Sequence, residues 1–146
     1  MAHADVEGRL EIMVVSSRMS ACLGTDCVRV HSWTSDGRRV CWNPGAGVVG
    51  AVDAESRHAR VPASLARRYP LPRPDFWVAW TRAEVHAKLL GVPILSWLKA
   101  HGLGGWEVPG IRTATHDVED LVVTVGRLES APRTTGAGHG EVGMVR

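Results

Sequence analysis

The stretch DFWVAWTRAEVHAKLL, residues 75–90, decides the fold because it is the clearest helical pattern in the chain. Its apolar side chains recur at helical spacing, at Phe76, Trp80, Ala83, Ala87 and Leu90. Asp75 can cap the start of this helix, and Gly91 can end it. We therefore expect one long helix, against which the strands of the chain pack.

Strands are expected before this helix. Residues 10–15 form an apolar run, and residues 27–31 alternate as a strand does. The turn sequence Ser-Asp-Gly at 35–37 is followed by residues 38–42, which read as the return arm of a hairpin. Residues 48–55 form one more strand, so four strands precede the helical part of the chain.

Helices and then strands follow. A short helix is expected at 62–68 and another at 93–100, since proline stands near the start of each. Strands are expected at 111–115 and 121–126, joined by the polar residues 116–120. This order is typical of an α+β fold, with a small antiparallel sheet packed with the long helix.

The composition fits one globular domain. The chain has 146 residues, of which 45% are apolar and 22% charged. We expect a flexible N-terminus over residues 1–9, a single domain over 10–128, and a disordered Gly-rich tail over 129–146.

Charge and hydropathy exclude several classes of function. The net charge is only +2, which disfavours a nucleic-acid-binding protein. The apolar runs are too short to span a bilayer, and the N-terminus does not resemble a secretory signal. We therefore expect a cytoplasmic protein without nucleic-acid or membrane partners.

The three cysteines fit that compartment as reduced thiols. A zinc site could in principle be formed by Cys22, Cys27, His31 and Cys41. Their spacing differs from that of the usual paired zinc knuckles, and Cys41 lies in a strand-like run. We therefore favour buried or incidental thiols.

Two carboxylates, Asp53 and Glu55, stand at the end of the strand at 48–55. Side chains two residues apart on a strand point to the same face, where like charges repel unless a cation lies between them. Such an oxygen-rich pair suits Mg²⁺, a hard cation that also binds substrate phosphates. The simpler alternative is that the strand has ended and both acids are solvated in a loop.

Glu84 and Lys88 are four residues apart on the long helix, so they share a face. They could form a surface ion pair worth about 0.3–0.5 kcal/mol. Lysine is rare in this chain, however, and its ammonium is a compact donor for phosphate oxygens. Glu84 could then complete a metal site or act as a general base.

These residues resemble a family, the 4′-phosphopantetheinyl transferases. The helix segment WTRAEVHAK, residues 80–88, resembles the family signature W-[ST]-x-K-E-x-x-x-K, and Gly91 follows as in K-x-x-G. The segment AVDAE, residues 51–55, resembles the family's G-[IV]-D-[IV]-E strand. The turn at 34–37 stands where the family has a serine–histidine turn, and residues 65–69 resemble the segment before the helix.

The resemblance covers residues 28–126 in the family's order. Such enzymes transfer the 4′-phosphopantetheine arm of coenzyme A to a serine of an acyl or peptidyl carrier protein and release 3′,5′-ADP. The resemblance implies that Asp53, Glu55 and Glu84 hold Mg²⁺ on the coenzyme A pyrophosphate. It implies a transferase-like half fold, and the divergence of the motifs from the family pattern favours a carrier protein of specialised metabolism, in polyketide or nonribosomal peptide biosynthesis.

Further roles are implied by position. Glu84 would help to deprotonate the carrier serine, directly or through a water, and Lys88 would stabilise charge on the leaving phosphate. Ser35 and Arg38, in the turn, and Lys88 are the residues expected to bind coenzyme A. Attack on a pyrophosphate needs a metal, a base and a cation near the leaving oxygen, which this set would supply.

The chain also departs from the family pattern. Ala83 replaces the first lysine of the signature, Ser35 stands at the turn histidine, and Pro93 replaces the second glycine after the helix. These changes favour the alternative of a non-catalytic relative that binds coenzyme A or a carrier protein. The retained carboxylates and Lys88 favour an enzyme.

The length of the chain bears on its assembly. Large members of the family carry two similar halves in one chain, and this chain has one. Either the protein forms a homo-oligomer with a shared site, which is the commoner solution for a short chain, or its site is more open than in the family. Candidates for an apolar interface are Ile94, Leu95, Trp97, Leu98 and Trp106, although the tryptophans could equally belong to the core.

Overall fold

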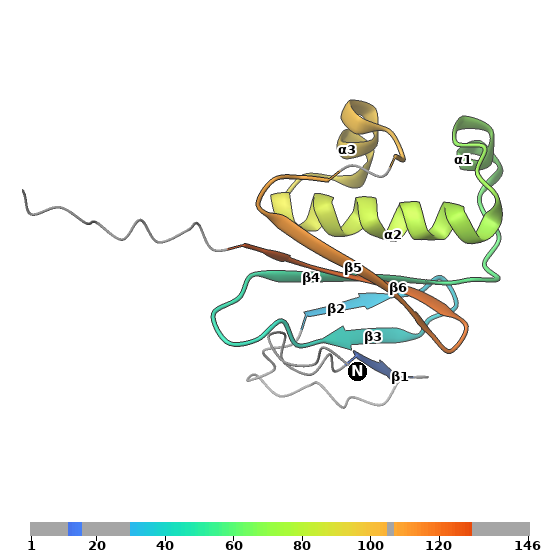
Figure 1. Ribbon diagram of the computed structural model, residues 1–146. Helices are drawn as coiled ribbons and strands as arrows, with labels where there is room; N and C mark the ends of the chain where they lie inside the picture. Colours follow the sequence, from blue (N-terminus) through green and yellow to red (C-terminus); the bar gives the residue numbers. More distant parts are fainter. Residues whose placement is uncertain (1–11, 16–29, 105–106, 130–146) are drawn as a thin grey trace, which may run out of the picture.

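The computed structural model describes residues 12–15, 30–104 and 107–129. It has an α+β fold of six strands and three helices within these residues (Figure 1). The elements run in the order β1 (Ile12–Val15), β2 (Val30–Trp33), β3 (Arg39–Trp42), β4 (Gly50–Ser56), α1 (Ala63–Arg68), α2 (Arg73–Leu90), α3 (Ile94–His101), β5 (Ile111–Val118) and β6 (Leu121–Leu128).

The strands form two small antiparallel sheets rather than the one expected from sequence. The first has the order β1-β3-β2, and the second has the order β4-β6-β5. In Figure 1 the layers run from the first sheet, through the second sheet, to α2, with α1 and α3 beyond it. The second sheet is therefore covered on both faces, which is why its central strand β6 is almost entirely buried.

Two apolar clusters occupy the two faces of the second sheet. Val122 belongs to the cluster that contains Phe76 and Trp77 of α2. Val123, the next residue of β6, belongs to the cluster that contains Val40 and Trp42 of the first sheet. This alternation follows from the period of two in a strand and fixes which side chains face α2.

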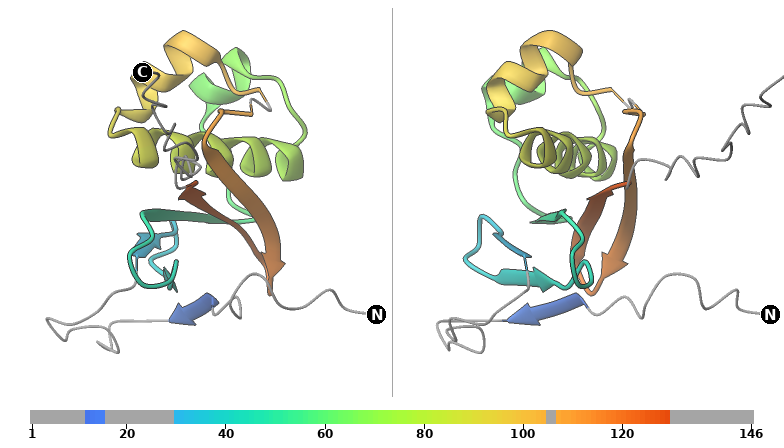
Figure 2. Two further views of the ribbon diagram at one scale, coloured as in Figure 1. Left: turned by 60° about the vertical axis from the view of Figure 1, so that its left-hand side comes forward. Right: turned by 90° about the vertical axis from the view of Figure 1, so that its left-hand side faces the viewer.

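The long helix lies close to β6. A Cβ added at Gly126 would stand 2.4 Å from Cγ1 of Val85, so only glycine permits this approach of β6 to α2. The right-hand view in Figure 2, which looks along α2, shows this helix between the second sheet and α3. Gly91 ends α2 with a φ of 66°, as the sequence predicts for a left-handed C-cap.

Two boundaries differ from the sequence predictions. Asp75 does not cap α2: the N-cap is Pro72 and Asp75 lies within the first turn, because prolines set the backbone for an earlier start. The prediction of a five-residue connection at 116–120 is also wrong, because β5 extends to Val118 and β6 begins at Leu121, which leaves a turn of two residues. Glu119 adopts a φ of 57° there, which completes the turn and extends the hairpin.

Some predictions fall on residues that the structure does not describe. The flexible segment 1–9, residues 130–146 of the tail, the cysteines Cys22 and Cys27, and the interface candidate Trp106 lie outside the described residues. The interface candidates Trp97 and Leu98 are buried in the core, because they pack in the cluster that contains Phe76. Cys41 is buried in β3. Among the described helices, none combines the length and the apolar character that crossing a membrane requires.

Candidate functional site

Asp53 and Glu55 are both buried within β4, so the solvated-loop alternative does not hold. Asp53 lies opposite Thr124 of β6, and Thr124 contacts Thr81 of α2 through their hydroxyl oxygens at 2.8 Å. Opposite residues in an antiparallel pair point to the same face. Asp53 and Glu55 therefore lie on the face of the second sheet that α2 covers.

Lys88 reaches from α2 to Asp53. Its Nζ lies 2.8 Å from Oδ1 of Asp53, 3.1 Å from Oγ of Ser32 and 2.9 Å from the carbonyl oxygen of Val52. An ammonium has three donors, and these acceptors match all three. The helix signature and the strand motif, 35 residues apart in sequence, thus meet in one ion pair.

Asp53 has an environment that opposes its charge. Burial raises the pKa of Asp53, and the nearby charge of Glu55 adds to the rise, while Lys88 and the hydroxyl of Ser32 oppose it. Ser32 donates to Oδ1 of Asp53 at 2.8 Å. The carboxyl group therefore depends on Lys88 and Ser32 to remain ionised within the fold.

Glu84 lies one turn before Lys88 and is half-buried. Desolvation by burial raises the pKa of Glu84, and the negative charge of Asp53 raises it further, against the effect of Lys88. A carboxyl group with a raised pKa accepts a proton more readily near neutral pH. We define Ser32, Asp53, Glu84 and Lys88 as the strand–helix cluster.

Glu55 is held by different partners. Oε2 of Glu55 accepts from the backbone N–H of Ser35 at 3.1 Å, and Oε1 accepts from the Ser35 hydroxyl at 2.9 Å. The N–H of Ser56 also donates to Oε1, at 2.7 Å. Ser35 and Glu55, which sequence reasoning placed in separate roles, are thus joined in one contact.

Arg38 lies between two carboxylates. It donates from Nη2 to Asp36 at 2.7 Å and to Asp120 at 3.0 Å, and from Nη1 to Asp120 at 2.5 Å. Hydrogen bonds from Arg38 lower the pKa of Asp36 and of Asp120 to about 2 each. The guanidinium of Arg38 therefore ties the β2–β3 turn to the β5–β6 turn.

Sequence reasoning missed Ser32 and Asp120. In β2, Ser32 is buried between the exposed residues His31 and Trp33. A polar side chain at a strand position that points into the protein could therefore have identified Ser32 from the sequence. Asp120 carried no such signal, because the turn that contains it was expected to be a longer loop. Its contact with Arg38 spans 82 residues and depends on the packing of the two hairpins.

The donor set can be compared with the needs of Mg²⁺. Asp53 is buried and Glu84 half-buried, and the charge of Asp53 adds to the cost of ionising Glu84, a condition that a hard cation relieves. Within the described part of the chain, no group of three His, Cys, Asp or Glu side chains is arranged to hold a metal. Mg²⁺ would therefore need phosphate or water oxygens beside these carboxylates, as it commonly does.

Comparison with known protein families, curated proteins and solved structures finds no match to this chain.

Proposed function

We propose that this protein is a Mg²⁺-dependent 4′-phosphopantetheinyl transferase of the holo-acyl-carrier-protein synthase type, which acts on an acyl or peptidyl carrier protein. The observation that supports this proposal most is the contact of Lys88 with Asp53 at 2.8 Å. It joins the two motifs that carry the resemblance, although neither motif by itself requires the other to be near.

The strand–helix cluster offers what the reaction needs. The carrier serine oxygen would form a bond to the phosphorus that bears the pantetheine arm, and the bond from that phosphorus to the oxygen of 3′,5′-ADP would break. Glu84 would take the serine proton, because its raised pKa suits a general base. Mg²⁺, when bound, would stabilise negative charge on the pyrophosphate oxygens.

Asp53 and Glu84 would hold the metal, with Glu55 as the third ligand that the resemblance implies. Lys88 would donate to the leaving phosphate. Since its three present acceptors match its three donors, a phosphate oxygen would take the place of Ser32 or Asp53. Coenzyme A would be the co-substrate, with Ser35 near it on the β2–β3 turn.

Mass spectrometry of an apo carrier protein tests the proposal. The carrier would be incubated with coenzyme A, Mg²⁺ and this protein, and a parallel sample would contain excess chelator. We expect the carrier to gain one 4′-phosphopantetheine group only with Mg²⁺. Full transfer in chelator would contradict the metal role of Asp53 and Glu84.

The non-catalytic alternative rests on a specific observation, the buried Ala83 at the position of the signature lysine. A chain of this kind would bind coenzyme A or a carrier protein without modifying the carrier. Binding of coenzyme A with no mass change of the carrier would support it.

A further inference from the structure

Charged and hydroxyl side chains near the end of β4 are joined by a series of hydrogen bonds. Ser35 donates to Glu55, Arg38 joins Asp36 to Asp120, and the Ser56 hydroxyl donates to Oδ2 of Asp120 at 3.2 Å. The N–H of Ser56 donates to Glu55, and the backbone between the neighbours Ser35 and Asp36 closes the series into a ring. We call this set the turn ring; its members are Ser35, Asp36, Arg38, Glu55, Ser56 and Asp120.

The turn itself is built to present the Ser35 amide. Thr34 and Gly37 close it with a backbone hydrogen bond of 3.0 Å, and Gly37 takes a φ of 86° that favours glycine. The N–H of Arg38 donates to the hydroxyl of Thr34 at 3.0 Å. These bonds shape the turn locally, but none of them fixes the turn relative to β4.

Arg38 and Asp120 supply that fixed relation. Asp120 follows the strand that pairs with β6, and the N–H of Arg57, at the end of β4, donates to its carbonyl oxygen at 2.8 Å. The side chain of Asp120 then meets Arg38 through two guanidinium nitrogens, a planar geometry that sets direction as well as attraction. The turn is thus held against the end of the strand that carries Glu55.

We propose that Arg38 and Asp120 are positioning residues for Glu55. By holding the β2–β3 turn, they keep the Ser35 amide and hydroxyl on the Glu55 carboxylate, which fixes its orientation on the face of β4 that also carries Asp53. This assigns Arg38 a different task from direct binding of coenzyme A. The consequence for the reaction rests on the proposed function, whereas the coupling of Asp120 to Ser35 does not.

A near-isosteric variant tests the coupling. Asp120→Asn keeps the shape of the side chain but loses the charge that Arg38 meets. The amide exchange rate of Ser35, measured by NMR at pH 7 in 50 mM salt, should rise about tenfold as the turn loosens. An unchanged exchange rate would overturn the inference.

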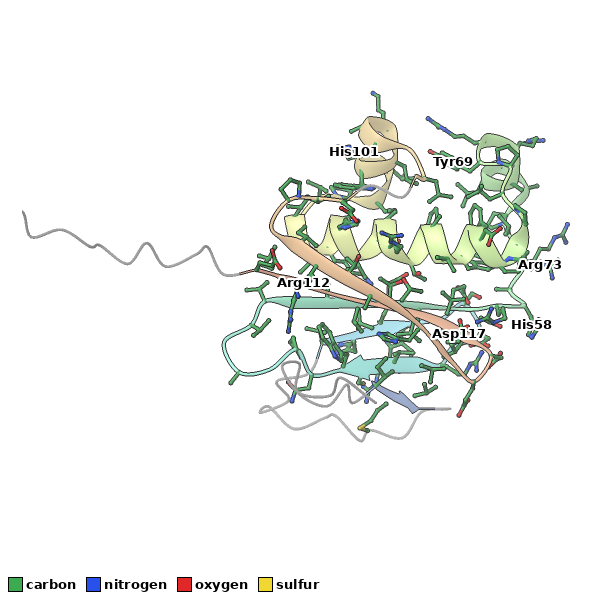
Figure 3. All side chains as sticks on the ribbon, in the orientation of Figure 1. His58, Tyr69, Arg73, His101, Arg112 and Asp117 are labelled. Carbon is green, nitrogen blue, oxygen red and sulfur yellow. The ribbon has the colours of Figure 1, made fainter. Side chains whose placement is uncertain are left out.

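The chain offers a matched control in Asp117→Asn. Asp117 lies in the same β5–β6 hairpin and pairs with Arg57, but it lies outside the turn ring. Figure 3 shows Asp117 at the same end of the molecule as His58. This variant should leave Ser35 exchange within about twofold of the wild type; an equal rise in both variants would overturn the inference.

A second variant, at Arg38, keeps the positive charge but removes the planar guanidinium that contacts Asp36 and Asp120. Arg38→Lys leaves one ammonium where a guanidinium met two carboxylates, so it should reproduce the effect of Asp120→Asn. The double variant should exchange no faster than Arg38→Lys alone, because both changes break the contact of Arg38 with Asp120. Independent, multiplying effects would contradict the coupling of Arg38 to Asp120.

Kinetics then separate positioning from stability. If transfer is observed, Asp120→Asn should raise KM for coenzyme A about tenfold while kcat stays within about twofold. If the amide exchange of Ser35 changes while KM for coenzyme A does not, the orientation of Glu55 has no effect on the binding of coenzyme A, and the positioning role of Arg38 and Asp120 is overturned. Altered exchange in a protein with no transfer would leave the coupling standing and refute the proposed function instead.

Discussion

The strand–helix cluster and the turn ring contain the same kinds of charged group, yet the pKa values of Asp53 and Glu84 in the cluster are raised while those of Asp36 and Asp120 in the ring are lowered. In the cluster, burial raises the pKa of Asp53 although Lys88 lies 2.8 Å away. In the ring, hydrogen bonds from Arg38 lower the pKa of Asp36 and Asp120 to about 2. The difference is solvent access, since Asp53 is only 8% exposed whereas Asp36 and Asp120 are open to water.

This contrast separates two tasks. Ion pairs at a surface hold loops in place and are inexpensive to keep ionised, because water solvates the charges. Buried carboxyl groups with raised pKa values are costly to ionise and are a feature of functional sites. On this ground we assign the proposed chemistry to the cluster and the proposed orienting role to the ring.

The largest expected effect concerns Glu84. Glu84→Gln keeps the shape of the side chain and removes the anion, so transfer should fall by about two to four orders of magnitude. Single-turnover rates with an apo carrier protein measure this loss. A normal rate would remove Glu84 from the chemistry and leave the cluster as a structural feature.

The same variant should be more stable than the wild type at pH 7. A raised pKa means that the folded protein binds the proton more tightly than the unfolded chain, so stability is lost as pH rises through that pKa. Removing the anion should raise Tm by about 2–4 °C at pH 7. The gain should vanish below pH 4.5, where the unfolded chain is protonated as well; a gain that persists at acid pH would contradict the cause.

A smaller effect is expected at Ser32, which donates to Asp53 and accepts from Lys88. Ser32→Ala removes a bond to a buried carboxylate and should cost about 1–2 kcal/mol of unfolding free energy. Urea unfolding measures it, with Ser96→Ala, at an exposed serine of α3, as the control. Equal losses in the two variants would show that the contacts of Ser32 with Asp53 and Lys88 add nothing to stability beyond those of an exposed serine.

Salt should act on the ring more than on the cluster. At 0.5 M salt, exposed charges are screened over a few ångströms, whereas buried pairs are screened much less. Amide exchange at Ser35 should therefore accelerate at high salt, while the buried backbone of β4 stays protected. Parallel acceleration in both regions would indicate a general loosening of the fold instead.

The smallest expected effect is the response of the ring to acid. Asp36 and Asp120 have lowered pKa values, so their contribution to stability is present above pH 3.8 and is lost as pH falls towards about 2. Asp36→Asn should flatten the pH dependence of stability in that window. An unchanged profile would show that Arg38 does not set these pKa values.

The elements of the fold follow closely from the sequence, and the site follows in part. The helix and its Gly91 end were predictable because apolar spacing and a C-cap act over a few residues. The split into two sheets was not predictable, since strand order depends on contacts between distant segments. Asp53, Glu84 and Lys88 were found as separate motifs, and their proximity through Lys88 appears only when β4 and α2 pack together.

In the turn ring, by contrast, the sequence identified Arg38 but not the residues that Arg38 contacts. Arg38 was predicted to bind coenzyme A, and that prediction is untested, but its contacts with Asp36 and Asp120 give it a structural partner on each side. Asp120 could not be paired with Arg38 from sequence because the hairpin turn was expected to be a five-residue loop. A local error in turn length thus concealed a contact between distant residues.

The most direct test of the central claim, that the strand–helix cluster performs the transfer, compares the two lysines of the chain. Single-turnover transfer from coenzyme A to an apo carrier protein would be followed by mass spectrometry for the wild type, Lys88→Ala and Lys99→Ala. Lys99 lies exposed in the last turn of α3 and serves as the matched control. We expect Lys88→Ala to slow transfer by about two to four orders of magnitude while Lys99→Ala stays near the wild-type rate; equal rates in all three proteins would contradict the account.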